Sequence, residues 1–241
     1  MRSGITIIVF AFFSLCSAAL VAEELERILE RHYEARGGLE RLREVQSLKM
    51  TGTNRFQDQE ISVEYLAKRP NLLRMESSSP QMDLIRGFDG KRPWQVISAP
   101  GTPSQTVTMN EQDAREVIRE SDFDGPLVDY EEKGHEIEYL GAETLGEREV
   151  YLLRVTEAAG VTDTYYLDAE TFLVGVKEID VAVEGGNIAF HIYYDDFREV
   201  DGVLFPFRTT GTSDGQTVFV GTLSEIEVNP DLDRKLFMSP E

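Results

Sequence analysis

The chain has 241 residues, and its 24 Lys and Arg against 44 Asp and Glu give a formal net charge of −20 at pH 7. Such an acidic surface repels phosphate groups, so we expect neither nucleic-acid binding nor peripheral membrane binding. We also expect no stable membrane insertion, because the apolar run near the N-terminus is too short for a stable span. Hydrophobic residues make up 41% of the chain, which is enough to form one substantial core.

The first 22 residues have the layout of a secretory signal peptide. A basic Arg2 precedes an apolar run from Ile5 to Leu15, and small residues then lead into a charged segment. We expect cleavage after Ala19 or Ala22, and the alternative is a leader that is kept as a membrane anchor. The sequence therefore predicts a chain that works outside the cytoplasm.

The only cysteine, Cys16, lies inside this leader, and the bulky Leu15 before it differs from the small residue found at lipoprotein processing sites. We therefore assign Cys16 to the discarded leader. Removing the leader takes away Arg2 and no acidic residue, so the net charge of residues 23–241 is −21. Without cysteine this part cannot form a disulfide, and its stability depends on its hydrophobic core.

Two segments have the period of amphipathic helices. From Glu23 to Val45, apolar residues recur at helical spacing and Gly37-Gly38 interrupts the pattern, so we expect two short helices or one kinked helix. Asn110 is a good N-cap for a second helical segment that continues to about Glu120, with acidic residues in its first turn.

Most of the remaining chain alternates apolar and polar residues, which is typical of β-strands. Short turns rich in Gly, Asp and Asn separate these stretches, and such turns require antiparallel pairing because parallel neighbours need long crossovers. We expect about ten or eleven strands and a mostly polar connection from Phe123 to Gly134. The strands expected after it are His135–Leu140, Glu149–Thr156, Thr162–Leu167, Phe172–Val183, Ile188–Phe197, Leu204–Thr210 and Gln216–Val228.

A sheet of this size must curl, and its hydrophobic face must be covered. The economical fold is mainly β with two helical segments (α+β), in which a strongly curved antiparallel sheet forms a half-open barrel covered by the helices. A closed barrel or a sandwich is the alternative. No linker rich in Gly, Ser or Pro divides residues 23–241, which we expect to form a single domain.

No catalytic or metal-binding constellation stands out in the sequence. The chain after the leader has no cysteine, has only the histidines His32, His135 and His191, and lacks the Gly-x-Ser-x-Gly elbow of serine hydrolases. His191 with Asp195 and Asp196 is a conceivable metal site, but the spacing is not a recognised ligand set. We expect a non-catalytic protein with no metal and no cofactor.

The remaining chemical signal is apolar and aromatic. Most such residues fill a core, but Met and aromatic side chains also suit an adaptable cavity for hydrocarbon chains. Arg74 would bind a carboxylate or phosphate head group if it points inward, and is otherwise a surface arginine or an ion-pair partner. Gly37 and Gly38 are hinge candidates. The candidates for lining a ligand cavity are Tyr65, Arg74, Met75, Met82, Trp94, Phe190, Ile192, Tyr194, Phe205 and Phe207.

Several short motifs occur in a distinctive order along the chain. They are Ala35–Leu42, Arg69–Arg74, Phe88–Gly90 leading to Trp94, Asp124–Leu127, Tyr165–Thr171, Tyr194–Phe197, Val200–Gly202 followed by Phe205-Pro206, and Leu236-Phe237. In this order they resemble exported proteins of the outer-membrane lipoprotein-sorting family, within the LolA/LolB/RseB-like superfamily. The resemblance spans residues 23–241 nearly end to end.

The resemblance implies a LolA-like half-barrel with helices in its mouth and a hydrophobic cavity that shelters acyl chains in the periplasm. We therefore expect a soluble, monomeric periplasmic carrier or chaperone for a lipid, an acyl chain or a lipoprotein, without catalysis. The alternative is an envelope protein-interaction or stress-sensing module that uses the same fold without a bound lipid and docks a protein partner on its acidic surface.

Overall fold

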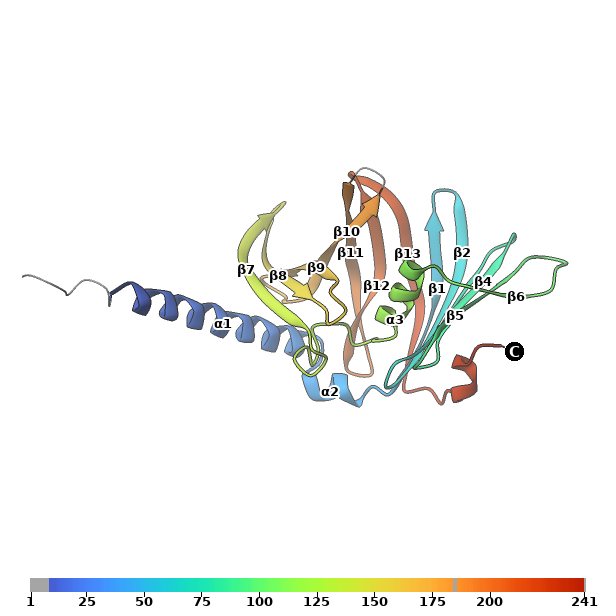
Figure 1. The fold of residues 1–241 in the computed structure, drawn as a ribbon, viewed down its shortest axis with the longest axis horizontal. Coiled ribbons are helices and arrows are strands. Elements are labelled where there is room, and N and C mark those ends of the chain that lie inside the picture. Colours follow the sequence, from blue (N-terminus) through green and yellow to red (C-terminus); the bar gives the residue numbers. More distant parts are fainter. Residues whose placement is uncertain (1–8, 184–185, 241) are drawn as a thin grey trace, which may run out of the picture.

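In the computed structural model, which describes residues 9–183 and 186–240, one curved antiparallel sheet carries helices on its inner side (Figure 1). The expected α+β fold with a half-open sheet is confirmed. The sheet has 13 strands rather than ten or eleven, because short or two-sidedly polar strands are hard to count from alternation. The strands are β1 (Ser47–Phe56), β2 (Gln59–Lys68), β3 (Leu72–Ser78), β4 (Asp83–Phe88), β5 (Pro93–Ser98), β6 (Gln105–Val107), β7 (Glu136–Leu145), β8 (Arg148–Thr156), β9 (Thr162–Asp168), β10 (Val174–Val183), β11 (Gly186–Val200), β12 (Val203–Ser213) and β13 (Gln216–Val228).

The strand order joins the two halves of the sheet through its first and last strands. It runs β6-β5-β4-β3-β2-β1-β13-β12-β11-β10-β9-β8-β7. β1 pairs with β13 in the middle, with Leu48 opposite Val228. β6 and β7 are consecutive in the chain but form opposite edges of the sheet, so the segment between them must cross the width of the sheet.

The helices are α1 (Val9–Ala35), α2 (Leu39–Glu44) and α3 (Glu111–Glu120), and a 3₁₀ helix, η1 (Arg234–Phe237), lies near the C-terminus. The break expected at Gly37-Gly38 separates α1 from α2. Asn110 caps α3 as expected, because its Oδ1 accepts a hydrogen bond from the backbone N–H of Asp113 at 2.8 Å. α3 and the segment after it form the crossing from β6 to β7 (Figure 1).

α1 starts within the expected signal peptide, of which residues 1–8 lie outside the described residues. The helix is exposed at Leu20 (62%) and becomes buried at Ile28 and Leu29. Figure 1 shows its first turns projecting away from the sheet. Within the part of the chain that the structure describes, no helix is long and apolar enough to cross a membrane.

The helices cover different parts of the inner face. Ile28 and Leu29 of α1 pack in one cluster with β8 and β9 residues such as Leu153. Val117 of α3 packs with Leu73 and Phe88 on the opposite half of the sheet. Helices that cover the two ends of a curved sheet leave its centre less covered, and the cavity described below lies there.

Candidate functional site

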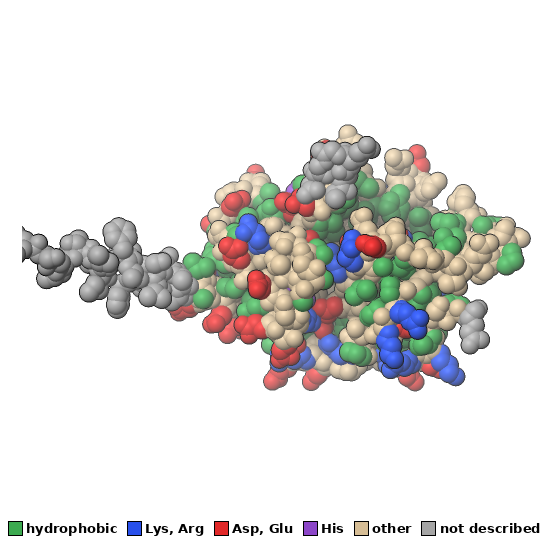
Figure 2. Space-filling model, in the orientation of Figure 1, with side chains coloured by type: hydrophobic (Ala, Val, Ile, Leu, Met, Phe, Trp, Pro, Cys, Tyr) green, Lys and Arg blue, Asp and Glu red, His purple; other side chains and the backbone are tan. Residues whose placement is uncertain are grey.

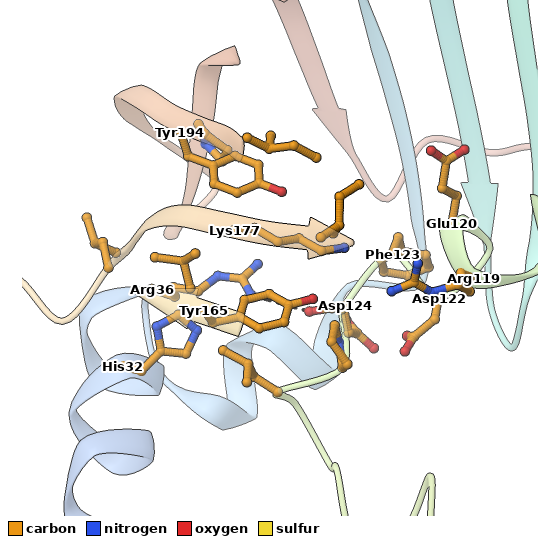
Figure 3. A pocket seen from close by; sticks show the side chains of 18 of the residues that line it. His32, Arg36, Arg119, Glu120, Asp122, Phe123, Asp124, Tyr165, Lys177 and Tyr194 are labelled. Atoms are coloured by element: carbon orange, nitrogen blue, oxygen red, sulfur yellow. Dashed lines mark hydrogen bonds between the residues drawn. The ribbon is translucent and has the colours of Figure 1, made fainter. Parts of the chain in front are cut away.

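A cavity of about 530 Å³ lies between the inner face of the sheet and the helices (Figure 3). It is lined by the end of α1, by α3, by the segment 122–127, and by strands from both halves of the sheet. The segment 122–127 belongs to the crossing between the two sheet edges, so the strand order itself places these residues over the cavity.

Much of the lining is apolar or aromatic. β9 to β12 supply one continuous part of it, and Tyr65 and Met75 approach from β2 and β3. The apolar and aromatic lining residues are Tyr65, Met75, Phe123, Pro126, Leu127, Tyr165, Leu173, Val174, Ile179, Ile192, Tyr194, Phe197, Leu204 and Pro206.

An ion-pair network holds α3 over the sheet on another side of the cavity. Arg119 of α3 donates to Glu157 Oε1 through Nη2 at 2.6 Å, and it also pairs with the buried Asp163 of β9. Lys177 of β10 lies 3.0 Å from the same Asp163 carboxylate. The cations Arg119 and Lys177 thus compensate the carboxylates of Glu157 and Asp163, and this pairing offsets the cost of removing these charges from water.

Hydrogen bonds from tyrosines fix the ends of the segment 121–127. The Tyr65 hydroxyl donates to the carbonyl oxygen of Glu120 at 2.7 Å, and the Tyr33 hydroxyl donates to that of Leu127 at 2.6 Å. Asp122 lies 2.6 Å from Lys133 Nζ, and burial raises the pKa of its carboxyl above the ordinary range. The first part of the expected polar connection, residues 123–127, is therefore an ordered part of the cavity wall.

Two charged groups of the cavity have no ion-pair partner within the described residues. Arg36, directly after α1, makes a single side-chain hydrogen bond, from Nη1 to the carbonyl oxygen of Asp124 at 3.4 Å. Burial lowers the pKa of Arg36, and the charge of Asp124 opposes this shift in part. The Glu120 side chain is exposed to solvent in the cavity and is surrounded by protein atoms on its other sides. Burial, and then the neighbouring Glu116, raises the pKa of Glu120 to about 7.

Four of the candidate residues, Tyr65, Met75, Ile192 and Tyr194, line this cavity, and the others do not. Tyr65 and Met75 are cross-strand partners in β2 and β3. Ile192 and Tyr194 are alternate residues of β11 and so share its inner face. Strands far apart in the sequence thus bring these four side chains together.

Arg74 and Trp94 lie on the outer face of the sheet. The Trp94 indole is buried beneath the C-terminal segment, and its Nε1–H donates to the carbonyl oxygen of Phe237 at 2.9 Å. Arg74 pairs with Glu76 and donates to the carbonyl oxygen of Leu236. The expectation that either residue lines the cavity is wrong, because the alternation of side chains along β3 and β5 turns both outward. For Arg74 the alternative expectation, that it is an ion-pair partner, is the one that the structure shows.

Met82 and the three phenylalanines occupy other places. Met82 is 43% exposed in the turn before β4. Phe190 stacks on Phe219 with ring centroids 6.3 Å apart. Phe205 and Phe207 are buried in the cluster that includes Leu42 of α2, so they fill the core and do not line the cavity.

The backbone at Gly37 and Gly38 has positive φ angles of 111° and 94°. A Cβ at Gly37 would lie 2.0 Å from the carbonyl oxygen of Gly202, whereas a Cβ at Gly38 would meet nothing within 4 Å. Gly37 therefore permits a close approach of the α1–α2 link to the β11–β12 turn. These observations give the glycines a structural reason, and the hinge remains a prediction.

Sequence reasoning missed the polar cavity residues, including His32, Arg36, Arg119 and Lys177. His32 is 2% exposed, and its Nδ1 lies 2.8 Å from the carbonyl oxygen of Phe172. Arg36 stands directly before the two glycines, which is the one local signal that its backbone takes a special course. The others depend on strand pairing, which no local pattern reveals.

The conceivable metal site is not assembled. His191 Nε2 lies 3.2 Å from Glu178 on the outer face, and Asp196 pairs with Arg198. Among the residues that the structure describes, no three His, Cys, Asp or Glu side chains are grouped so as to hold a metal ion.

Known proteins share the fold of this chain but not its sequence. No protein-family model matches the sequence, and no curated protein is similar to it in sequence. Several solved structures match most of the chain. Three of them with TM-scores above 0.5 are a DUF1329 family protein from Desulfovibrio piger (TM-score 0.61, 9% identity, 88% of this chain and 96% of that one), a LolA superfamily protein from Nitrosomonas europaea (0.56, 16%, 89% and 97%), and an outer membrane lipoprotein-sorting protein domain from Vibrio parahaemolyticus (0.55, 10%, 88% and 94%).

These matches cover nearly the whole of the compared chains, and at such low identity they show the fold alone. The chain therefore has the LolA-like fold, as the order of its sequence motifs implied.

Proposed function

We propose that this protein is a non-catalytic periplasmic carrier or chaperone that shelters the hydrocarbon part of a lipid, an acyl chain or a lipidated polypeptide. The observation that carries the proposal is the cavity of about 530 Å³ between sheet and helices, with its apolar and aromatic lining. A cavity of this kind buries most of a small ligand. Each buried methylene group contributes about 0.8 kcal/mol, so a hydrocarbon chain needs few polar contacts.

The fold supports the same proposal. Two of the similar structures are called a LolA superfamily protein and a lipoprotein-sorting protein domain. The leader-like first 22 residues agree with a role outside the cytoplasm. In this proposal ligand exchange needs a movement of the cavity wall, with Gly37-Gly38 as the hinge next to the end of α1.

The proposal is tested by filling the cavity. Ile192→Trp adds bulk to a lining residue, and Tyr193→Trp places the same side chain at the neighbouring position on the outer face, where Tyr193 is 39% exposed. We expect Ile192→Trp to weaken the binding of a fluorescent fatty acid about tenfold or more, because the indole displaces the chain. Tyr193→Trp should bind as the wild type does. Equal binding by all three proteins would overturn the proposal.

Mass spectrometry of lipids extracted from natively purified protein separates this function from the alternative. A reproducible acyl ligand, lost in Ile192→Trp and kept in Tyr193→Trp, supports the carrier. A protein that is free of lipid and fails to bind the fatty acid supports the envelope protein-interaction module. The acidic residues on the visible face (Figure 2) are the feature that such a module would present to a basic partner.

A further inference from the structure

We propose that the cavity contains an anion subsite at Arg36, so that the sheltered ligand carries a carboxylate or phosphate head group beside its hydrocarbon part. This inference rests on the proposed function and adds the chemical class of the ligand. Its strongest support is a guanidinium that lies within the cavity wall, where the charge of Asp124 acts on it but no carboxylate of a described residue forms an ion pair with it.

Main-chain contacts hold Arg36 in place. Its backbone N–H donates to the carbonyl oxygen of His32, and its carbonyl oxygen accepts from the N–H of Leu204 at 3.1 Å. The next residue, Gly37, packs directly against Gly202. The side chain therefore starts from a fixed point between α1 and β12, and its charge is held in the cavity without help from an ion pair.

The acidic residues near Arg36 are already committed to other cations. Asp124 makes two hydrogen bonds to Arg69 and offers Arg36 only its backbone carbonyl oxygen. Asp163 is shared by Arg119 and Lys177. A cation that is largely removed from water and has no ion-pair partner is costly, and groups perturbed in this way are concentrated at functional sites.

Two phenol groups add hydrogen-bond donors to the cavity. Figure 3 shows the hydroxyls of Tyr165 and Tyr194 pointing into the cavity, with the Lys177 side chain between them. Neither hydroxyl forms a hydrogen bond to another described residue, and burial raises both pKa values, that of Tyr194 to about 12. Both phenols therefore stay protonated at neutral pH, and they are free to donate to polar groups of a ligand that reaches them.

The subsite also sets the orientation of the ligand. Ile192 and Phe197 of β11 and Leu204 of β12 line the cavity beside the charged group. A head group at Arg36 thus leaves the hydrocarbon chain against this apolar wall. Glu120, on the far side in Figure 3, is an acidic group that an anionic head group avoids.

The experiment compares palmitic acid with methyl palmitate, which has the same chain and no charge. We expect the wild type to bind the acid about tenfold or more tightly than the ester, because a hydrogen bond to a charged group is worth that much. Arg36→Met should remove the preference, so that the acid and the ester bind with equal affinity. Arg36→Lys should keep part of the preference. The matched control is Arg31→Met, because Arg31 is an exposed arginine in the last part of α1 that pairs with Glu34.

Each outcome separates the subsite from the carrier function. If the ester binds but the acid gains nothing, or if Arg36→Met keeps the preference, the subsite is wrong and the carrier stands. If neither ligand binds, the carrier itself is wrong. Competition by inorganic phosphate, lost in Arg36→Met, would assign the site to phosphate as a free ion as well as to lipid head groups. Thermal unfolding checks that each variant is folded. We expect the Arg36 variants to be folded, because Arg36 forms no ion pair with a described residue that their folding would lose.

Discussion

Arg69 and Asp124 form a two-point ion pair, in which Arg69 Nη1 donates to Oδ2 at 2.6 Å and Nη2 donates to Oδ1 at 2.9 Å. The Asp124 side chain is only 6% exposed. Arg69 also donates to the carbonyl oxygens of Val45 and Leu42. One guanidinium therefore ties the segment over the cavity to the end of α2 and to the turn between β2 and β3.

Loss of this pair should destabilise the protein strongly. Arg69→Met removes the arginine donors from a buried carboxylate and from the carbonyl oxygens of Val45 and Leu42, of which only the latter keeps another donor, the N–H of Val45. We therefore expect the free energy of unfolding to fall by about 3 kcal/mol in urea denaturation. Arg43→Met is the control, because Arg43 pairs with Asp129 at the surface and is half exposed. Its loss should cost less than about 1 kcal/mol. Similar losses in the two variants would contradict the structural role of Arg69.

The two glycines after α1 should respond differently to alanine. Gly37→Ala places a Cβ against the carbonyl oxygen of Gly202 and also strains φ, whereas Gly38→Ala adds only the strain. We expect losses of about 3–5 kcal/mol for Gly37→Ala and about 1–3 kcal/mol for Gly38→Ala. Chemical denaturation measures both. A smaller loss at Gly37 than at Gly38 would mean that the contact with Gly202 is not present in solution.

Buried His32 should make the protein sensitive to acid. Burial, and then the charge of Arg36, lowers its pKa from 6.5 to about 4. His32 therefore binds a proton less readily in the folded state than in the unfolded state. The free energy of unfolding keeps the full contribution of neutral His32 above pH 6.5 and loses it as the pH falls toward 4. The effect amounts to about 3 kcal/mol.

The variant His32→Asn tests this dependence, since its amide can still donate to the carbonyl oxygen of Phe172. We expect its free energy of unfolding to fall less than that of the wild type between about pH 7 and pH 4.5. Carboxylates contribute equally to both curves, so the difference isolates His32. Parallel curves would show that another group is responsible.

The single tryptophan should not sense a ligand in the cavity. Trp94 is buried against Phe237 on the outer face, with the sheet between it and the cavity. We expect its emission to stay unchanged when a fatty acid binds and to shift to the red on unfolding. Phe197→Trp in a Trp94→Phe background moves the reporter to the cavity wall, and its emission should change with ligand. A response from Trp94 alone would place the ligand on the outer face.

Local patterns predicted most of the elements. The cap at Asn110, the break at Gly37-Gly38 and the strand ladder after Gly134 each depend on neighbouring residues, and the structure contains all of them. The cavity wall was harder to predict. The segment 122–127 reads as a polar loop, and only its position between opposite sheet edges makes it part of the site.

Alternation showed which residues share a face of one strand, but not which face turns inward. Met75 and Arg74 are adjacent in β3, and one lines the cavity while the other contacts the C-terminal segment. An arginine for an anionic head group was a reasonable expectation from sequence. The structure points to Arg36 for that role, because Arg74 is occupied by Glu76 on the outer face.

By itself, the sequence determined the acidic surface, the antiparallel strands and the positions of the helices, since these follow from composition and from contacts between residues close in the chain. Only the tertiary structure decided that β1 pairs with β13, which residues surround the cavity, and which charges there lack a partner. Those features depend on pairings between residues more than a hundred positions apart, as between Leu48 and Val228, and chain folding selects them through burial of the whole sheet rather than through any local pattern.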